Sequence, residues 1–228
     1  MIGIIGAMQA EVETLQQQME QVTVSTISGV DFYHGFLQGK EVVVAQCGIG
    51  KVFAALCAQT MILTYHPECL INTGVAGGLT PDLGVGDITV ATTLVQHDMD
   101  TSAFGDPVGL ISGINVVHFP ADEGVSARLA TAAGSVGCQV KQGTIVSGDQ
   151  FISDPAKKQQ LHQNFDAVAC EMEGAAIAHV CYVNKTPFGV LRAISDSADG
   201  DGAMEYAEFM KLAAHRSTQT ILAFCQQA

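Results

Sequence analysis

The stretch A-V-A-C-E-M-E-G, residues 167–174, decides the fold because it leads a short apolar run directly into two carboxylates. The stretch F-G-V-L-R-A-I-S-D, residues 188–196, has the same form and carries Arg192 and Asp196. Another acid, Glu11, follows the first apolar run of the chain. Open α/β sheets hold their functional groups at strand ends of this kind. We therefore expect these acids and the arginine to share one site.

Working outward, short apolar or β-branched runs recur along the whole chain. Most are unbroken rather than alternating, which predicts strands covered on both faces. They lie at residues 2–6, 41–46, 69–73, 88–95, 115–118, 143–147, 167–170 and 188–194. Helical patterns lie between them: a stripe of Met8, Val12, Leu15 and Met19, then residues 51–65, 125–136 with Asp122 as cap, 174–183 and about 204–224. The acidic residues 197–202 are expected to form a mobile loop beside the site. The alternation predicts a single α/β domain, 1–228, with a mostly parallel sheet.

Composition narrows the class of protein. With 228 residues, 48% hydrophobic and 14% charged, the chain must bury a large core and leave some apolar surface, which favours a homo-oligomer. A net charge of -13 opposes binding to nucleic acid or an anionic membrane. The seven cysteines form no C-x-x-C pair, and no apolar run reaches the roughly 18 residues of a membrane span. The start of the chain has no basic leader. A cytoplasmic enzyme or binding protein is expected.

Several common motifs are absent. The tetrapeptide G-I-G-K at 48–51 lacks the residues of a phosphate loop or a dinucleotide fingerprint and favours a tight turn, so no such cofactor is expected. The histidines form no cluster, so no metal site is expected. The glycines at 74–78 either form a plain turn or let a ligand approach the backbone. Glu173 is expected in the first turn of a helix, where the dipole would keep it ionised for binding sugar hydroxyls or simply offset the dipole.

Six motifs occur together in the order and spacing of one known family. They are G-A-M-Q-A-E at 6–11, G-I-G-K at 48–51, N-T-G-V-A-G-G at 72–78, S-G-D-Q-F-I at 147–152, E-M-E at 171–173 and R-A-I-S-D at 192–196. The chain resembles the 5'-methylthioadenosine/S-adenosylhomocysteine nucleosidases of the nucleoside phosphorylase superfamily over nearly its whole length. The resemblance implies a three-layer αβα sandwich around a mixed, mostly parallel sheet, a homodimer, and hydrolysis of a purine thionucleoside without a cofactor.

The resemblance also implies catalytic roles. Glu11 would activate the attacking water, and Asp196 would protonate N7 of adenine and hold its exocyclic amine. Glycosidic cleavage passes through an oxocarbenium-like state and needs an acid and a water-activating carboxylate of this kind. Glu173 would bind the 2' and 3' hydroxyls of ribose with Met172 against the sugar, and Arg192 would help Glu11 to place the water.

The remaining implied residues bind the substrate. Phe151 would stack on the purine, the Ile152 backbone would read its edge, and Gly77 and Ser195 would lie beside it. Met8, Ile49, Tyr206 and, from the neighbouring subunit, Phe104 would line the apolar pocket for the 5'-thio substituent. Val75 and Tyr206 depart from the serine and phenylalanine of several relatives, which affects water placement and the choice of 5' substituent.

Three alternatives stay open. A purine nucleoside phosphorylase would use phosphate, but related phosphorylases carry arginine at the position of Asn72 and serine at that of Val75, and Glu11 would repel the dianion. A hydrolase of 6-amino-6-deoxyfutalosine is compatible with the sequence. A non-catalytic purine nucleoside sensor could lose an acid, whereas Glu11 and Asp196 are both present.

Overall fold

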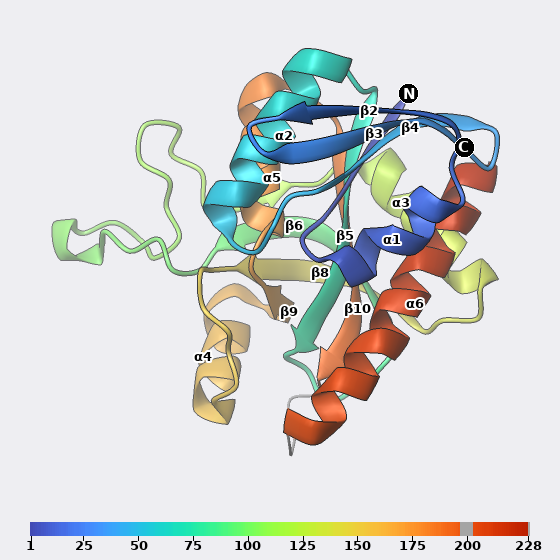
Figure 1. Ribbon diagram of the computed structural model, residues 1–228. Helices are drawn as coiled ribbons and strands as arrows, with labels where there is room; N and C mark the ends of the chain where they lie inside the picture. The colour runs from blue at the N-terminus through green and yellow to red at the C-terminus, as the bar shows by residue number, and fades with distance from the viewer. Residues whose placement is uncertain (197–202, 228) are drawn as a thin grey trace.

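The computed structural model describes residues 1–196 and 203–227, apart from the side chains of 203–207 (Figure 1). The expected loop at 197–202 therefore lies outside the described residues. The strands are β1 Ile2–Gly6, β2 Glu20–Ile27, β3 Val30–Leu37, β4 Lys40–Gln46, β5 Cys69–Gly78, β6 Ile88–Gln96, β7 Phe119–Pro120, β8 Val140–Ser147, β9 Ala167–Glu171 and β10 Phe188–Asp196. The helices are α1 Gln9–Gln17, α2 Lys51–Tyr65, the short 3-10 helix η1 Ser102–Phe104, α3 Glu123–Ser135, α4 Pro155–Phe165, α5 Gly174–Asn184 and α6 Ala203–Gln227.

The central sheet closes on itself over part of its width. Its order is β10-β6-β8-β9-β5-β1-β4-β3-β2, and β10 also pairs with β5. The strands β10, β6, β8, β9 and β5 therefore form a ring, from which β1, β4, β3 and β2 extend as an arm. Parallel pairings join β1 to β4 and β5, and β5 to β10, while β5 with β9 and the β2–β3–β4 meander are antiparallel.

Helices cover both faces of this sheet. One apolar core lies under α2 and α5, which contribute side chains such as Met61 and Ile177. A second core lies under α1, α3 and α6, with Leu15, Leu129 and Ile221. The two groups of helices stand on opposite sides of the sheet in Figure 1. The mixed three-layer αβα fold expected from the sequence is confirmed. Within the described ranges, no helix combines the length and apolar character needed to cross a bilayer.

One predicted strand, 115–118, is wrong. Asn115 has a φ of 56°, in the left-handed region, and its N–H donates to the Ile111 carbonyl at 2.9 Å. These residues therefore form a turn that an isolated bridge between Ile111 and Val116 closes, and the strand begins only at Phe119. The apolar run 115–118 resembles a strand in sequence, but the left-handed backbone of Asn115 turns the chain there. The pattern of apolar residues does not reveal such a turn.

The sequence analysis missed β2, β3 and α4. All but the last residue of β2 are exposed, so that strand lacks the buried apolar signal used to find the others. The turns Ser28-Gly29 and Gln38-Gly39 have both residues at positive φ, as two-residue hairpins require, and offered a signal. The proline at the start of α4, preceded by the capping Asp154, offered another.

Candidate active site

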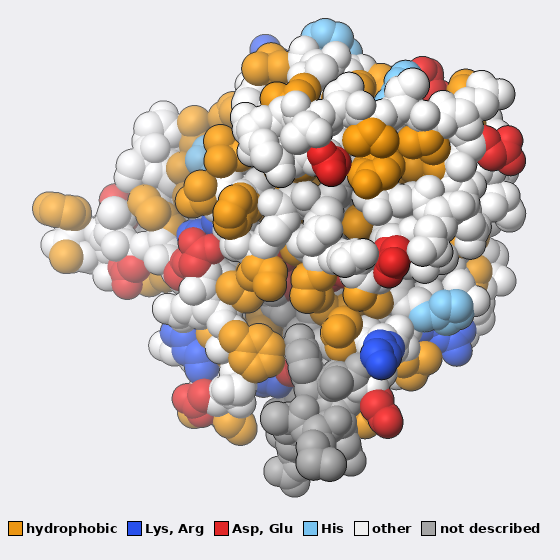
Figure 2. Space-filling view, in the orientation of Figure 1, with side chains coloured by type: hydrophobic (Ala, Val, Ile, Leu, Met, Phe, Trp, Pro, Cys, Tyr) orange, Lys and Arg blue, Asp and Glu red, His pale blue; other side chains and the backbone are white. Residues whose placement is uncertain are grey.

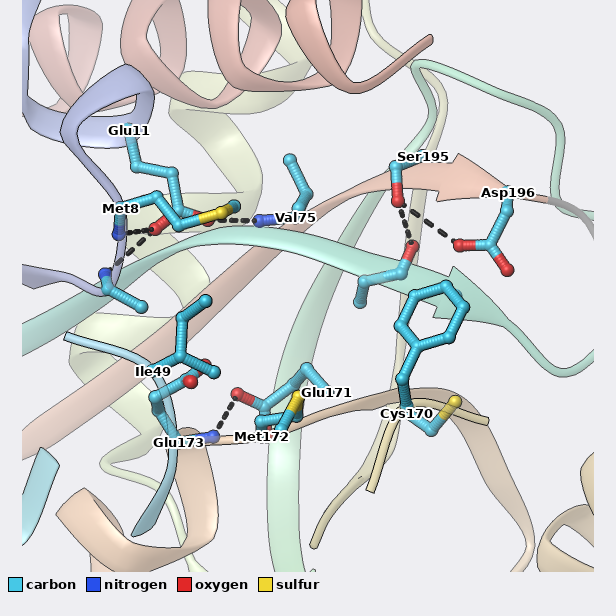
Figure 3. Close-up of a pocket in the computed structure, with 14 residues that line it drawn as sticks. Met8, Glu11, Ile49, Val75, Cys170, Glu171, Met172, Glu173, Ser195 and Asp196 are labelled. Carbon is cyan, nitrogen blue, oxygen red and sulfur yellow. Dashed lines mark hydrogen bonds between the residues drawn. The ribbon is translucent and has the colours of Figure 1, made fainter. Parts of the chain in front are cut away.

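A cavity opens at the ends of the strands β1, β5, β9 and β10 (Figure 3). It encloses about 570 Å³ of space, including its open mouth. Four carboxylates face an otherwise largely apolar lining. The lining residues are Ala7, Met8, Glu11, Ile49, Val75, Ala76, Gly77, Phe151, Cys170, Glu171, Met172, Glu173, Ser195 and Asp196. The structure thus brings together most of the residues predicted to form one site.

Glu11 lies at one side of the cavity, where the first turn of α1 follows β1. Only 3% of its surface is exposed. Its Oε2 accepts hydrogen bonds from the N–H groups of Ala7 at 2.8 Å and Met8 at 2.9 Å, and its Oε1 accepts one from Val75 at 3.0 Å. Three backbone donors from two strand ends therefore hold the carboxyl in place.

The environment of Glu11 shifts its titration. Burial raises its pKa, and the Arg192 charge and the backbone donors only partly offset the rise, so the net pKa lies above the usual value. Gly74 has to be glycine here, because a Cβ at this position would lie 2.5 Å from Glu11 Oε1. A carboxylate with a raised pKa is suited to accept a proton from water near neutral pH.

Arg192 lies behind the cavity and does not line it. Its Nη2 donates to Glu171 Oε2 and to Asn72 Oδ1, and its Nη1 donates to the Leu191 carbonyl at 3.0 Å. Glu173 Oε2 is 3.9 Å away. Arg192 was expected on the substrate, whereas the structure places it among buried acids on the inner side of the cavity wall.

Glu171 is the partner that the sequence analysis left without a role. The carboxylate accepts hydrogen bonds from the hydroxyl of Ser147 and from the N–H groups of Glu173 at 2.9 Å and Gly174 at 2.8 Å. Burial raises its pKa, but Arg192 and these donors outweigh burial, so the net pKa is lowered. Glu171 is therefore the ionised member of the pair Glu171–Glu173.

Glu173 occupies the N-cap position of α5 and faces the cavity from the end of β9. Its side chain makes no capping hydrogen bond and instead accepts from the Gly50 N–H at 2.8 Å. Burial and the nearby negative charge of Glu171 raise its pKa to about 7. The expectation that the helix dipole keeps Glu173 ionised is therefore wrong, because burial beside a second carboxylate outweighs the dipole.

Asp196 lies across the cavity from Glu11, at the end of β10 (Figure 3). Its Oδ1 accepts from the Ser195 hydroxyl at 3.1 Å, and its Oδ2 accepts from the Lys158 ammonium at 2.8 Å. A Cβ on Gly77 would lie 3.1 Å from Asp196 Oδ2. Gly77 thus leaves room for the carboxyl and for whatever group it contacts.

Apolar side chains complete the cavity. Met8 lies near Glu11 and Ile49 near Glu173, and Met172 lies between them and the Asp196 end (Figure 3). Phe151 lines the part of the cavity beside Asp196. Ile152 joins Phe151 around a smaller extension beside Asp196 and Gly77. This arrangement places an aromatic ring next to the carboxylate of Asp196 and two apolar side chains, Met8 and Ile49, at the far end of the cavity.

Phe104 and Tyr206 are not among the lining residues that the structure describes. Phe104, in the projecting segment that carries η1, is 89% exposed and does not line the cavity of its own chain. A contribution from a second copy stays a prediction. The side chain of Tyr206 lies outside the described residues. Sequence reasoning did not find Lys158, because a lysine on an unrecognised helix carries no motif. Across the described parts of the chain, no cluster of three or more His, Cys, Asp or Glu side chains is arranged to hold a metal ion.

Comparison with known proteins gives one consistent family. A model of the phosphorylase superfamily matches residues 1–226. A 5'-methylthioadenosine/S-adenosylhomocysteine nucleosidase from Shewanella pealeana is 42% identical over 229 residues, covering 99% of each chain. The Neisseria meningitidis nucleosidase of the same name, in complex with methylthio-immucillin-A, superimposes with a TM-score of 0.94 at 38% identity over 100% of this chain and 99% of its own.

A third relative has a different name. A futalosine hydrolase from Helicobacter pylori superimposes with a TM-score of 0.93 at 36% identity, covering 100% of this chain and 97% of its own. The family model and these relatives match the chain over nearly its whole length. The chain belongs to the phosphorylase superfamily and, within it, to the 5'-methylthioadenosine/S-adenosylhomocysteine nucleosidases, which are N-glycosyl hydrolases.

Proposed function

We propose that this protein hydrolyses the N-glycosidic bond of 5'-methylthioadenosine and S-adenosylhomocysteine, and also of 5'-deoxyadenosine, releasing adenine and the corresponding sugar. The observation that carries the proposal is the placement of Glu11 and Asp196 on opposite sides of one cavity with an apolar lining between them. Cleavage at a glycosidic carbon needs a water-activating carboxylate on one face and an acid at the leaving group.

In this mechanism Asp196 donates its proton to N7 of adenine, so that the purine leaves as a neutral molecule when the bond from C1' to N9 breaks. Glu11 takes a proton from water, whose oxygen forms the new bond to C1'. Glu173 holds the ribose hydroxyls, and its charge, when ionised, stabilises the developing cation. Val75 supplies a backbone N–H to Glu11 but no hydroxyl to the water, so Glu11 places the water without help from that side chain.

The cavity wall argues against a phosphorylase. Among the described residues, the lining contains Glu11, Glu171, Glu173 and Asp196 but no arginine or lysine. A phosphate dianion needs several cationic or N–H donors, and Arg192 is already engaged by Glu171 and Asn72. These carboxylates would repel a phosphate dianion, whereas they accept neutral water as the nucleophile.

The first experiment incubates the protein with 5'-methylthioadenosine, with and without phosphate, and identifies the sugar product beside adenine by mass spectrometry. We expect free 5-methylthioribose at the same rate in both samples. A requirement for phosphate, with the sugar 1-phosphate as product, would instead make the protein a phosphorylase.

A second substrate is 6-amino-6-deoxyfutalosine. The full-length similarity to a futalosine hydrolase from Helicobacter pylori favours including it. The same assay with this nucleoside as the competing substrate gives the ratio of the two kcat/KM values. That ratio decides which substrate the cavity prefers.

We also propose a cytoplasmic homodimer in which Phe104 completes the cavity of the neighbouring copy. Exposed apolar side chains form a row on α2, including Val52, 70% exposed, and Leu56, 56% exposed. Figure 2 shows apolar side chains on this face and at the tip of the segment that carries η1. Apolar area of this extent is typical of a surface that a partner covers.

A further inference from the structure

Lys158 is a buried lysine, although burial removes water from a charged ammonium group and so destabilises it. It lies in the first turn of α4, only 5% exposed, and its Nζ is 2.8 Å from Asp196 Oδ2. An ammonium taken out of water is destabilised unless a carboxylate or other acceptor compensates it. The adjacent Lys157 is less buried and its Nζ donates to Gln160 at 3.1 Å on the surface. The contact therefore belongs to one lysine and not to a general basic patch.

The ion pair joins the first turn of α4 to the end of β10, next to the cavity. The cap Asp154, which accepts from the Ala156 N–H at 3.0 Å, fixes the start of α4, and Asp196 is the last residue of β10. Lys158 does not line the cavity, whereas Asp196 does. Lys158 thus reaches the acid from behind, where it can act on the carboxyl without touching a bound nucleoside.

Few other charges face this carboxyl from the described residues. Ser195, on β10, donates to Asp196 Oδ1 at 3.1 Å. From β9, Cys170 contributes a thiol whose pKa burial raises to about 12, so it is neutral, and Glu171 is paired with Arg192. From α4 the charged group is Lys158 itself. The ammonium is therefore the positive charge in direct contact with Asp196.

We propose that Lys158 is a positioning residue for Asp196, holding the carboxyl at the purine end of the cavity and stabilising the carboxylate formed when the proton leaves. The inference rests on the proposed function, in which Asp196 is the acid. The proton moves from Asp196 to N7 of the purine, and the electron pair of the broken C1'–N9 bond goes to the purine. Asp196 becomes an anion while Lys158 keeps its own proton.

This role predicts which kinetic constant changes. Lys158 contacts Asp196 but does not line the cavity, so its removal leaves nucleoside binding in place and slows the step in which Asp196 gives up its proton. A loss of kcat at nearly unchanged KM is the result expected of a group that acts only in the transition state.

The test compares Lys158→Met, Lys158→Gln and Lys158→Arg with the wild type and with Lys157→Met as the matched control. Adenine release from 5'-methylthioadenosine is measured over a range of substrate concentrations, and circular dichroism and thermal melting establish that each variant folds. We expect Met and Gln to lower kcat about ten- to a hundredfold, the size of a lost charge-assisted hydrogen bond. KM changes little, and Arg restores most of the lost kcat.

The outcomes separate this inference from the proposed function. If the wild type releases no adenine, or Asp196→Asn is as active as the wild type, the proposed function fails and the inference fails with it. If both tests succeed but folded Lys158→Met and Lys158→Gln keep the wild-type kcat, or lose activity only through a higher KM, only the inference is overturned. If only Lys158→Met fails to fold, Lys158→Gln still reports the loss of the charge and Lys158→Arg still reports its rescue.

Discussion

At the residue scale, carboxylates of one chemical type acquire different properties within one cavity. Glu171 is ionised because Arg192 and three hydrogen-bond donors outweigh its burial. Glu173 and Glu11 have raised pKa values because burial dominates. The surroundings of each carboxyl group set its pKa, so that Glu171 stays charged while Glu173 can exchange a proton near neutral pH.

Glu11→Gln and Asp196→Asn are expected to fold normally and to lose about 10²- to 10⁴-fold in kcat, because each removes one acid–base group. Adenine release and circular dichroism check the two parts of this prediction. Glu13→Gln, on the exposed face of α1, is the control that should retain wild-type activity. Normal turnover in a folded Glu11 or Asp196 variant contradicts the mechanism.

Glu173→Gln is expected to stabilise the protein more at pH 8 than at pH 5. The folded-state pKa of about 7 exceeds the ordinary value of 4.5, so the folded protein binds more protons than the unfolded chain between these values. Stability is therefore lost as pH rises through this window, and the full cost is present above it. Glutamine removes that cost, which is on the order of 1–3 kcal/mol. Urea titrations of both proteins at the two pH values measure it, and a difference independent of pH contradicts the assignment.

At the element scale, strands buried on both faces could be predicted because each is an unbroken apolar run. Helices between them could be predicted from apolar stripes at helical spacing. The sequence located the strand ends that carry Glu11, Glu171 and Asp196, and hence most of the cavity. The apolar pattern alone did not reveal β2, whose side chains are exposed, or α4, which only its turn and capping residues indicate. It also could not show that Arg192 binds Glu171 and Asn72 without lining the cavity, because spacing along a strand does not say which neighbours an arginine reaches.

Removal of a helix cap tests what α4 contributes. Asp154→Ala and Asp122→Ala each delete a carboxylate that accepts a backbone N–H, at the starts of α4 and α3. Each change is expected to lower the free energy of unfolding by about 0.5–2 kcal/mol, measured by urea titration. Only Asp154→Ala should also reduce kcat, since α4 carries Lys158. Equal kcat losses in the two variants would mean that the loss follows from stability alone.

At the scale of the whole molecule, one sheet runs through the described chain, and the site lies at the ends of four of its strands, β1, β5, β9 and β10. The continuity of this sheet supports the predicted single domain, which stays a prediction, as does the cytoplasmic location. The homodimer also stays a prediction, and it depends on the exposed apolar side of α2. An apolar helix such as α2 is buried on the side of Met61 and open on the side of Leu56.

Leu56→Glu is expected to produce a monomer with reduced activity, because a charge would be buried in the proposed interface and Phe104 would no longer reach the neighbouring cavity. Val24→Glu, at an exposed apolar position on β2, is the matched control and should stay dimeric. Light scattering after size-exclusion chromatography gives the masses. A wild type that elutes as a monomer with full activity rules out the shared site.

The ring of five strands has a consequence for how the protein is made. Its closing strand, β10, follows the other nine in the chain and pairs with β5 on one side and β6 on the other. During synthesis those two edges stay unpaired until β10 has left the ribosome, and unpaired edges invite association with other chains. β10, which carries Asp196, is also the strand that closes the ring. A growing chain therefore gains its acid and loses its exposed edges in the same late step.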